Sequence, residues 1–173
     1  MISVFTKPWS PEKYSISDIA ERIHALGADG IELPLRPGFH VSPESIEKQL
    51  PEAVSILSDF GLKIFSAAGE IDERVIRVLG MNGIRMLRIM LFIDMKKGSA
   101  ESLEDYNRRI DAVIPALEDS GVSLGIQNHC DYFVGSAGAL MSFMESYDKR
   151  HVNVVLDCAH CSIAGEPADM ALD

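Results

Sequence analysis

The sequence predicts a parallel α/β fold of the (β/α)8 barrel type, with about six βα units present in 173 residues. Apolar runs of strand length alternate with amphipathic stretches of helix length along the whole chain, and parallel strands need such crossover helices. The turn after the first strand, at residues 6–10, lacks the glycines of a doubly wound nucleotide-binding sheet, and no P-loop pattern occurs. A barrel is therefore favoured over an open doubly wound sheet.

The first half of the chain alternates strand, helix and strand in turn. Residues 2–6 form the first predicted strand, and apolar residues at three- and four-residue steps predict a helix over residues 15–26. Ser17 is the predicted N-cap of this helix and Gly27 its stop. The next elements follow the same logic: strand 30–33, helix 43–60, strand 62–67 and a short helix 72–79.

The second half continues this alternation. The predicted elements are strand 84–92, helix 102–119, strand 122–127, helix 136–147 and strand 152–156, with a sixth helix beginning before the last residue. The last of these strands is almost purely apolar, which is typical of a strand buried on both faces. Helix 102–119 is closed by Gly121, a residue type that commonly ends helices.

A complete barrel of this type needs about 250 residues, so two strands are expected to be missing. No glycine- or serine-rich linker divides the chain, which predicts a single domain over residues 1–173 that lacks its C-terminal strands. An incomplete barrel leaves strand edges unpaired, and unpaired edges invite association. We therefore expect the chain to form a homo-oligomer.

The composition narrows the class of partner. The formal net charge is −10, and no cluster of basic residues offsets it, so a nucleic-acid partner is not expected. The apolar runs are too short to cross a membrane, and the first residues lack the features of a signal peptide, so we expect a cytoplasmic protein. The three cysteines do not suggest a disulfide framework. A small molecule is the expected substrate.

Polar side chains follow the fifth and sixth predicted strands, at the edge where active sites of parallel α/β proteins lie. Gln127, Asn128 and His129 follow the fifth strand, and Asp157 and His160 follow the sixth. A carboxylate after a buried strand is costly unless it is paired or binds a metal, and these donors suit Mn2+, Mg2+, Co2+ or Zn2+. Alternatively, Asp157 caps the next helix or turn and His160 is an ordinary rim residue.

Earlier strands contribute further candidates. Trp9 is a candidate apolar wall of a binding site or a packing residue, and Arg36 is a candidate ligand for a phosphate or carboxylate or one half of an ion pair. Glu32 ends the second strand. Arg85 and Arg88 are expected to be solvated or paired.

A C-x-x-C pair, Cys158 and Cys161, follows the sixth strand. With His129 and Cys130 it could in principle form a zinc site, and a lone C-x-x-C can be redox-active. No second C-x-x-C occurs and the surrounding pattern is not thioredoxin-like. Packing of small side chains at the rim is the favoured interpretation.

Three motifs together resemble one known family. They are NVVLDCAH at residues 153–160 followed by AGEP at 164–167, GIQNH at 125–129, and GADGIEL at 27–33. In this order and spacing they resemble the xylose isomerase-like TIM barrels, the sugar phosphate isomerase/epimerase superfamily. The resemblance runs nearly from end to end.

The resemblance implies a single divalent metal held at the ends of strands five to eight. The fifth-strand ligand falls on Gln127, the sixth-strand aspartate on Asp157, and the histidine that usually touches substrate on His160. The implied reaction is isomerisation or epimerisation of a small sugar, sugar phosphate or polyol-derived ketone, by proton transfer next to a carbonyl that the metal polarises. With such a substrate, Asn128 and His129 are further candidate contacts, and Trp9 is a candidate wall for the sugar ring.

Gln127 departs from the family pattern, because an amide is neutral and cannot act as a general base. Glu32 and His129 are candidate replacements for the usual glutamate. Two other functions stay open: a metal-dependent hydrolase or lyase of the endonuclease-IV type, which predicts further metal-binding histidines on earlier strands, and a truncated barrel without catalysis.

Overall fold

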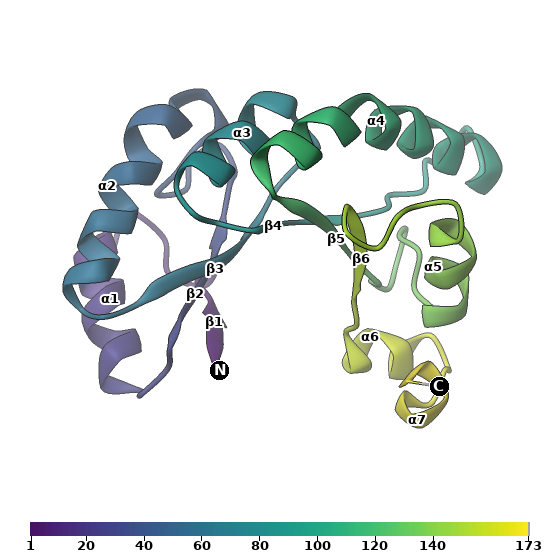
Figure 1. Ribbon diagram of the computed structural model, residues 1–173. Coiled ribbons are helices and arrows are strands. Elements are labelled where there is room, and N and C mark those ends of the chain that lie inside the picture. Colours follow the sequence, from purple (N-terminus) through teal and green to yellow (C-terminus); the bar gives the residue numbers. More distant parts are fainter. Residues whose placement is uncertain (173) are drawn as a thin grey trace. The chain divides into compact units, whose positions relative to one another are not determined.

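The computed structural model describes residues 1–172. Six strands form one parallel sheet in chain order and alternate with helices, which confirms the predicted barrel-type α/β fold (Figure 1). The chain divides into two compact units: the first holds residues 1–87 and 119–122, and the second holds residues 88–118 and those from 123 onward.

Every predicted strand is present, with ends that differ by a few residues. The elements in chain order are β1 Ser3–Phe5, α1 Ile16–Ala25, β2 Gly30–Pro34, η1 Pro43–Ser45, α2 Ile46–Asp59, β3 Lys63–Ala68, α3 Glu73–Met81, β4 Met86–Met90, α4 Ser99–Ser120, β5 Ser123–Gln127, α5 Ala137–Met144, β6 Val152–Val155, α6 Cys158–Ile163 and α7 Ala168–Leu172. The expected single sixth helix is thus two short helices.

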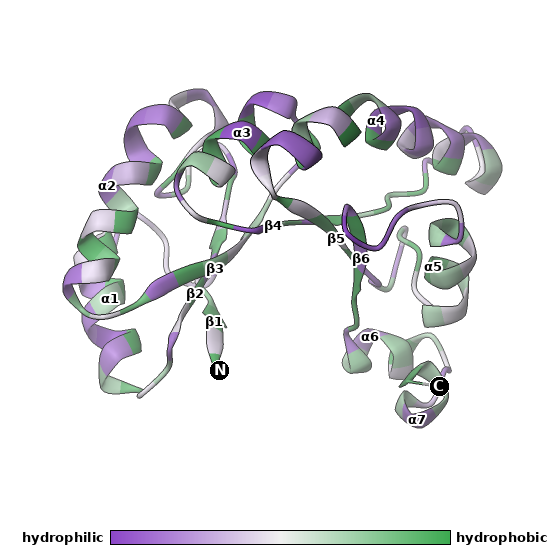
Figure 2. Ribbon diagram, in the orientation of Figure 1, coloured by the Kyte–Doolittle hydropathy of each residue, from purple (hydrophilic) through white to green (hydrophobic). Residues whose placement is uncertain are grey.

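The core of the first unit lies between β2, β3 and the helices α1 and α2. Helix α1 contacts α2 and β2, and α2 contacts β3. The apolar side chains that alternate along β2, Ile31 and Leu33, are fully buried. Both helices carry hydrophilic and hydrophobic residues on different sides (Figure 2), and the buried ones recur every three or four positions, as the periodicity predicted.

The N-cap of α1 is Ser15, and the prediction of Ser17 was wrong. The Ser15 hydroxyl accepts a hydrogen bond from the backbone N–H of Asp18 at 3.1 Å, and the Asp18 carboxylate accepts from the backbone N–H of Ser15 at 2.8 Å. This reciprocal capping box satisfies two backbone donors that would otherwise lack partners. Asp18, three residues after Ser15, is the acidic partner that makes Ser15 the N-cap.

Strand β2 approaches β3 very closely at Gly30. Gly30 pairs with Lys63, and a side chain at this position would overlap the carbonyl oxygen of Lys63. Just beyond, the register shifts by one residue, so that Ile31 pairs with Ile64 but Glu32 pairs with Ser66. This bulge leaves Phe65 as the extra residue of β3.

The second unit is built around β5, β6 and helices α4 and α5. Strand β5 pairs in parallel with β6 from Leu124 opposite Val152 to Gln127 opposite Val155. The interior of β5 is buried, but only Val152 of β6 is, and the strand ends one residue earlier than predicted. The expected burial of β6 on both faces was wrong, because fewer side chains cover a strand that has one hydrogen-bonded neighbour among the described residues.

Across residues 1–172, each helix is either too short or too polar to pass through a lipid bilayer.

Tyr147 makes the stability of the second unit depend on pH in the alkaline range. Burial, and then the nearby Asp111 carboxylate, raise the pKa of Tyr147 to about 12 from its ordinary value of 10. The unfolded chain therefore ionises first, so this group's contribution to stability is complete below pH 10 and is lost as the pH rises through about 12. Between pH 10 and about 12, we expect the unfolding free energy of Tyr147→Phe, measured by urea titration, to fall less than that of the parent. Parallel pH profiles for both proteins would contradict the assignment.

Candidate active site

The Asp157 carboxylate lies at the C-terminal end of β6 and divides its two oxygens between two tasks. Oδ1 accepts hydrogen bonds from the backbone N–H groups of Ala159 at 3.0 Å and His160 at 3.2 Å, which makes Asp157 the N-cap of α6. Oδ2 accepts from Gln127 Nε2 at 2.9 Å and lies 3.7 Å from His160 Nε2. Asp157 therefore caps α6, as the alternative interpretation of the sequence predicted, and it also contacts Gln127.

Gln127 connects Asp157 to a buried cation. Its amide oxygen Oε1 accepts a hydrogen bond from Nη1 of Arg88, which lies inside β4 and is 7% exposed. Its amide nitrogen donates to Asp157 at 2.9 Å. Arg88 was not among the predicted site residues. A charged residue within an apolar strand was the available signal, because a buried charge requires a partner.

Asn128 is fully buried and joins the end of β5 to the end of β6. Its Oδ1 accepts from the backbone N–H of Asp157 at 2.7 Å, and its Nδ2 donates to the carbonyl oxygen of Asp157 at 3.0 Å. The same nitrogen lies 3.2 Å from the Gly135 oxygen and from Cys161 Sγ. These contacts hold the two strand ends together, and the predicted substrate contact of Asn128 stays a prediction.

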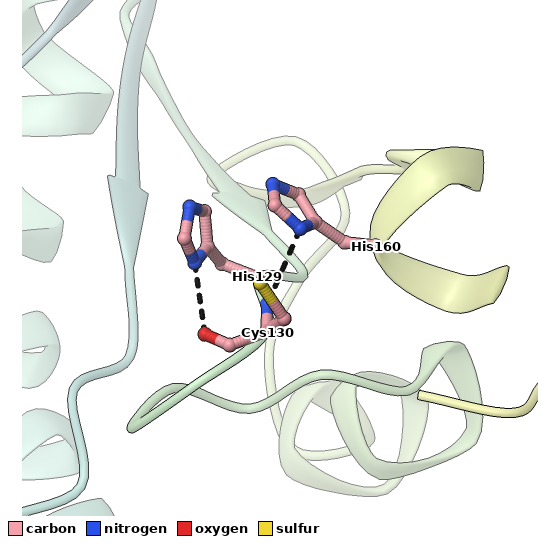
Figure 3. Close-up of side chains that lie close together, drawn as sticks. All are labelled: His129, Cys130 and His160. Atoms are coloured by element: carbon pink, nitrogen blue, oxygen red, sulfur yellow. Dashed lines mark hydrogen bonds between the residues drawn. The ribbon is translucent and has the colours of Figure 1, made fainter. Parts of the chain in front are cut away.

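His129, Cys130 and His160 lie together beside this network (Figure 3). The two imidazole rings are 3.9 Å apart between centroids and tilted by 39°. His129 Nδ1 lies 2.9 Å from the Cys130 carbonyl oxygen, and the Cys130 N–H donates to His160 Nδ1 at 3.4 Å. Burial, and then Asp131, raise the pKa of the Cys130 thiol, which makes it a poor nucleophile near neutral pH.

An aromatic wall continues from His129. Phe133 meets His129 edge to face at 4.9 Å, and Phe92 meets Phe133 at 5.5 Å. Phe92 also lines a cavity of about 550 Å3 at the start of α4. The loop that carries Phe133 is held by backbone hydrogen bonds from Val134 to Leu91 and from Ile93 to Tyr132. This wall was not predicted, because it depends on how that loop folds.

The two cysteines of the C-x-x-C pair differ in burial. Cys161 is fully buried beside Asn128, and Cys158 is exposed on the first turn of α6. Both are free cysteines. Burial and the nearby Glu166 carboxylate raise the pKa of the Cys161 thiol. The packing interpretation holds for Cys161.

The remaining predicted residues belong to the first unit. Glu32, in β2, accepts a hydrogen bond from the Ser66 hydroxyl at 3.1 Å. Arg36 follows β2 and is half-buried, and Trp9 is half-buried in the turn after β1. Their predicted roles as proton carrier, anion ligand and sugar wall stay predictions.

Gln127 and Asp157 do not form a cation site as they lie. The one oxygen that Gln127 could offer accepts from Arg88, whose guanidinium repels a cation, and its nitrogen is a donor that binds no metal. One oxygen of Asp157 is committed to α6. The divalent metal that the family resemblance places on this pair therefore does not fit the arrangement.

Comparisons with known proteins agree on the fold. The chain resembles 3-keto-D-glucoside 4-epimerase from E. coli (TM-score 0.78, 15% identity, 99% of this chain and 73% of that chain). It also resembles a D-psicose 3-epimerase studied with D-fructose (0.74, 17%, 98% and 68%) and a protein from Bacillus anthracis described as the probable 3-DHS dehydratase (0.75, 17%, 98% and 67%). No curated protein sequence matches the chain significantly.

The family model described as "Xylose isomerase-like TIM barrel" matches residues 20–172, which is most of the sequence. The match includes β5, β6 and every residue of the Arg88–Gln127–Asp157 network. The three motifs at residues 27–33, 125–129 and 153–167 all fall within the matched residues. The strand order agrees with such a fold. The chain belongs to the xylose isomerase-like TIM barrel family.

Proposed function

We propose that the chain carries part of an active site that isomerises or epimerises a small sugar or a related hydroxy-carbonyl compound. The observation that supports this proposal most is the Asp157–His160 pair at the end of β6, with His160 Nε2 3.7 Å from Asp157 Oδ2. Carboxylate and imidazole are the two groups that most often move protons in enzymes near neutral pH. The solved epimerases with a similar fold are consistent with it.

The proposed chemistry is proton transfer on carbon next to a carbonyl. His160 removes the proton and holds it as an imidazolium, which the Asp157 carboxylate stabilises. Return of the proton to the former carbonyl carbon, while the proton of the neighbouring hydroxyl passes to the former carbonyl oxygen, isomerises the substrate. Epimerisation needs a proton from a second acid, such as water, on the opposite face of the same carbon. The His129 ring, stacked against His160 at 3.9 Å, is placed to contact the same substrate. No step of this reaction uses a metal bound to Gln127 and Asp157.

The aromatic wall has a place in this proposal. Phe92 is 46% exposed, and together with Phe133 it presents an apolar surface next to His129. Aromatic faces and edges pack well against the C–H surface of a sugar ring. We propose that the substrate lies against this surface with its polar edge toward the histidines.

Exchange of substrate hydrogen for solvent deuterium tests the proposal directly. The chain is incubated in D2O with a panel of ketoses, aldoses and keto-sugars, and proton NMR follows loss of the signal next to the carbonyl. Because general acid–base catalysis typically contributes about 10²–10⁴-fold, we expect His160→Gln to slow exchange by at least about 100-fold. His151→Gln is the matched control, since His151 lies elsewhere in the same unit, near Glu118. Absence of exchange on every compound, or equal rates in His160→Gln and the parent, would overturn the proposal.

Sugar binding without turnover is a second candidate function. Gln127 stands where the family resemblance implies a glutamate, and its amide is held by Arg88 and Asp157, so it cannot act as a base. Saturable binding of a sugar, detected by calorimetry without any deuterium exchange, would favour this function over catalysis.

A further inference from the structure

The side chains of His129, Cys130 and His160 bring two imidazoles and a thiol together at the ends of β5 and β6 (Figure 3). One ring nitrogen of each histidine and the sulfur lie within 4.8 Å of one another, the one such group of three among residues 1–172. All three side chains are half-buried, so the group is neither loose on the surface nor sealed from solvent. We infer that these residues form a binding site for a soft divalent transition metal, best suited to Zn2+.

The spacing requires little rearrangement. Zn2+ binds nitrogen at about 2.0–2.1 Å and sulfur at about 2.3 Å, so a tetrahedral ion holds its ligand atoms roughly 3.3–3.7 Å apart. Atoms that already lie within 4.8 Å must approach by about 1.5 Å at most. Changes in side-chain rotation alone can supply that movement.

The hydrogen bonds of the two rings indicate which nitrogen of each carries a lone pair for a metal. A carbonyl oxygen only accepts, so His129 Nδ1, 2.9 Å from the Cys130 oxygen, carries the proton and Nε2 carries the lone pair. His160 Nδ1 accepts the Cys130 N–H at 3.4 Å, so its proton is on Nε2, which faces Asp157 Oδ2 at 3.7 Å. Metal-bound histidines characteristically donate their other N–H to a carbonyl or carboxylate in this way. A bound ion would replace the long contact at His160 Nδ1.

The donor set selects the ion. Two imidazoles and one sulfur suit Zn2+ and disfavour hard ions such as Mg2+, and three protein ligands leave a fourth position for water or substrate. On binding, the sulfur–metal bond forms, the thiol S–H bond breaks and the proton passes to water. Asp131, 3.7 Å from the sulfur, and Asp157 add negative charge that favours a cation.

The proposed site differs from the one that the family resemblance implies. That site would use Gln127 and Asp157, and here Gln127 accepts from Arg88. In the proposed site Asp157 orients His160 and does not bind the ion. The inference is tested apart from the proposed isomerase activity, because metal binding is measured without any sugar and deuterium exchange is measured on the metal-free chain. A bound ion would occupy His160 Nδ1, the nitrogen that the proposed reaction uses as its base.

Cobalt and zinc titrations of the whole chain test the inference. Co2+ is added to the metal-free protein, and near-ultraviolet absorption reports transfer of charge from a thiolate to cobalt. Zn2+ affinity is then measured by competition with a chromophoric chelator. We expect one ion per chain, a thiolate–cobalt band, and its loss in Cys130→Ser. Zinc binding should weaken by more than about 100-fold in Cys130→Ser and His129→Gln, beyond the loss typical of an outer-shell partner.

Three controls make the result decisive. Cys158→Ser removes an exposed thiol and His151→Gln another histidine of the same unit, and both should keep the band and the affinity. Gln127→Ala should bind zinc as the parent does. Binding that survives Cys130→Ser but disappears in Gln127→Ala, or the absence of any one-to-one complex, would overturn the inference. Circular dichroism confirms that each variant is folded.

A thiolate–cobalt band without deuterium exchange on sugars would support this site and reject the proposed function.

Discussion

Asn128→Asp is expected to destabilise the protein by about 3–5 kcal/mol, the cost typical of an unpaired buried charge. The side chain is fully buried, and its Nδ2 donates to the carbonyl oxygens of Gly135 and Asp157. An aspartate would place a carboxylate oxygen against both of these acceptors and remove a donor from each, although the Asp157 oxygen would keep the backbone N–H of Cys161 at 3.0 Å. Urea-induced unfolding of parent and variant measures the difference.

The matched control is Asn153→Asp in β6. Asn153 is half-buried, so the same change should cost about 1 kcal/mol or less, within the usual range for positions near the surface. A second variant, Asn128→Ala, should lose about 2–3 kcal/mol because it strands the Asp157 N–H without adding a charge. Equal stabilities for the two aspartate variants would show that Asn128 does not hold the two strand ends together.

Gly30→Ala is expected to cost about 3 kcal/mol or more, at the upper end for an overpacked position. The added methyl group would overlap the carbonyl oxygen of Lys63 and lie 2.8 Å from Phe65 Cε2. The clash is with the backbone of the neighbouring strand, which cannot move away without breaking the β2–β3 ladder. Thermal and urea unfolding monitored by circular dichroism would show the loss.

Gly27→Ala separates this clash from the general cost of replacing a glycine. Gly27 has a φ of 71° and nothing within 4 Å of the position that a methyl group would take. Only backbone strain opposes the change, which should cost about 1–2 kcal/mol. If Gly30→Ala were no more harmful than Gly27→Ala, the close approach of β2 to β3 would be contradicted.

The contact between Gln127 and Asp157 could be predicted because it follows from topology. Consecutive parallel strands end at the same edge of a sheet, so the residues after β5 and β6 must be neighbours whatever their side chains do. What those side chains do with each other could not be predicted in the same way. The direction of the Gln127 amide depends on Arg88, which reaches it from a strand 39 residues earlier.

Arg88 shows where periodicity misleads. It was expected to be solvated or paired, and it is paired but also buried, as are its neighbours Leu87 and Ile89. The helix cap shows the opposite case, because Ser15 and Asp18 carry a local signal that could have excluded Ser17. The stacking of His129 on His160 had no such signal, since it depends on the loop after β5 and the rotations of two side chains.

The bulge in β3 lets that strand hold one residue more than its pairing with β2 needs. Deleting Phe65 would place Ser66 directly after Ile64 and restore an even ladder, in which Ser66 still stands opposite Glu32. Residues that stand opposite each other in a regular ladder point to the same side of the sheet, so the Ser66 hydroxyl would keep the Glu32 carboxylate that it now contacts at 3.1 Å. Homologues that are one residue shorter here should therefore keep this pair, and the missing bulge would appear in an alignment as a gap instead of a substitution.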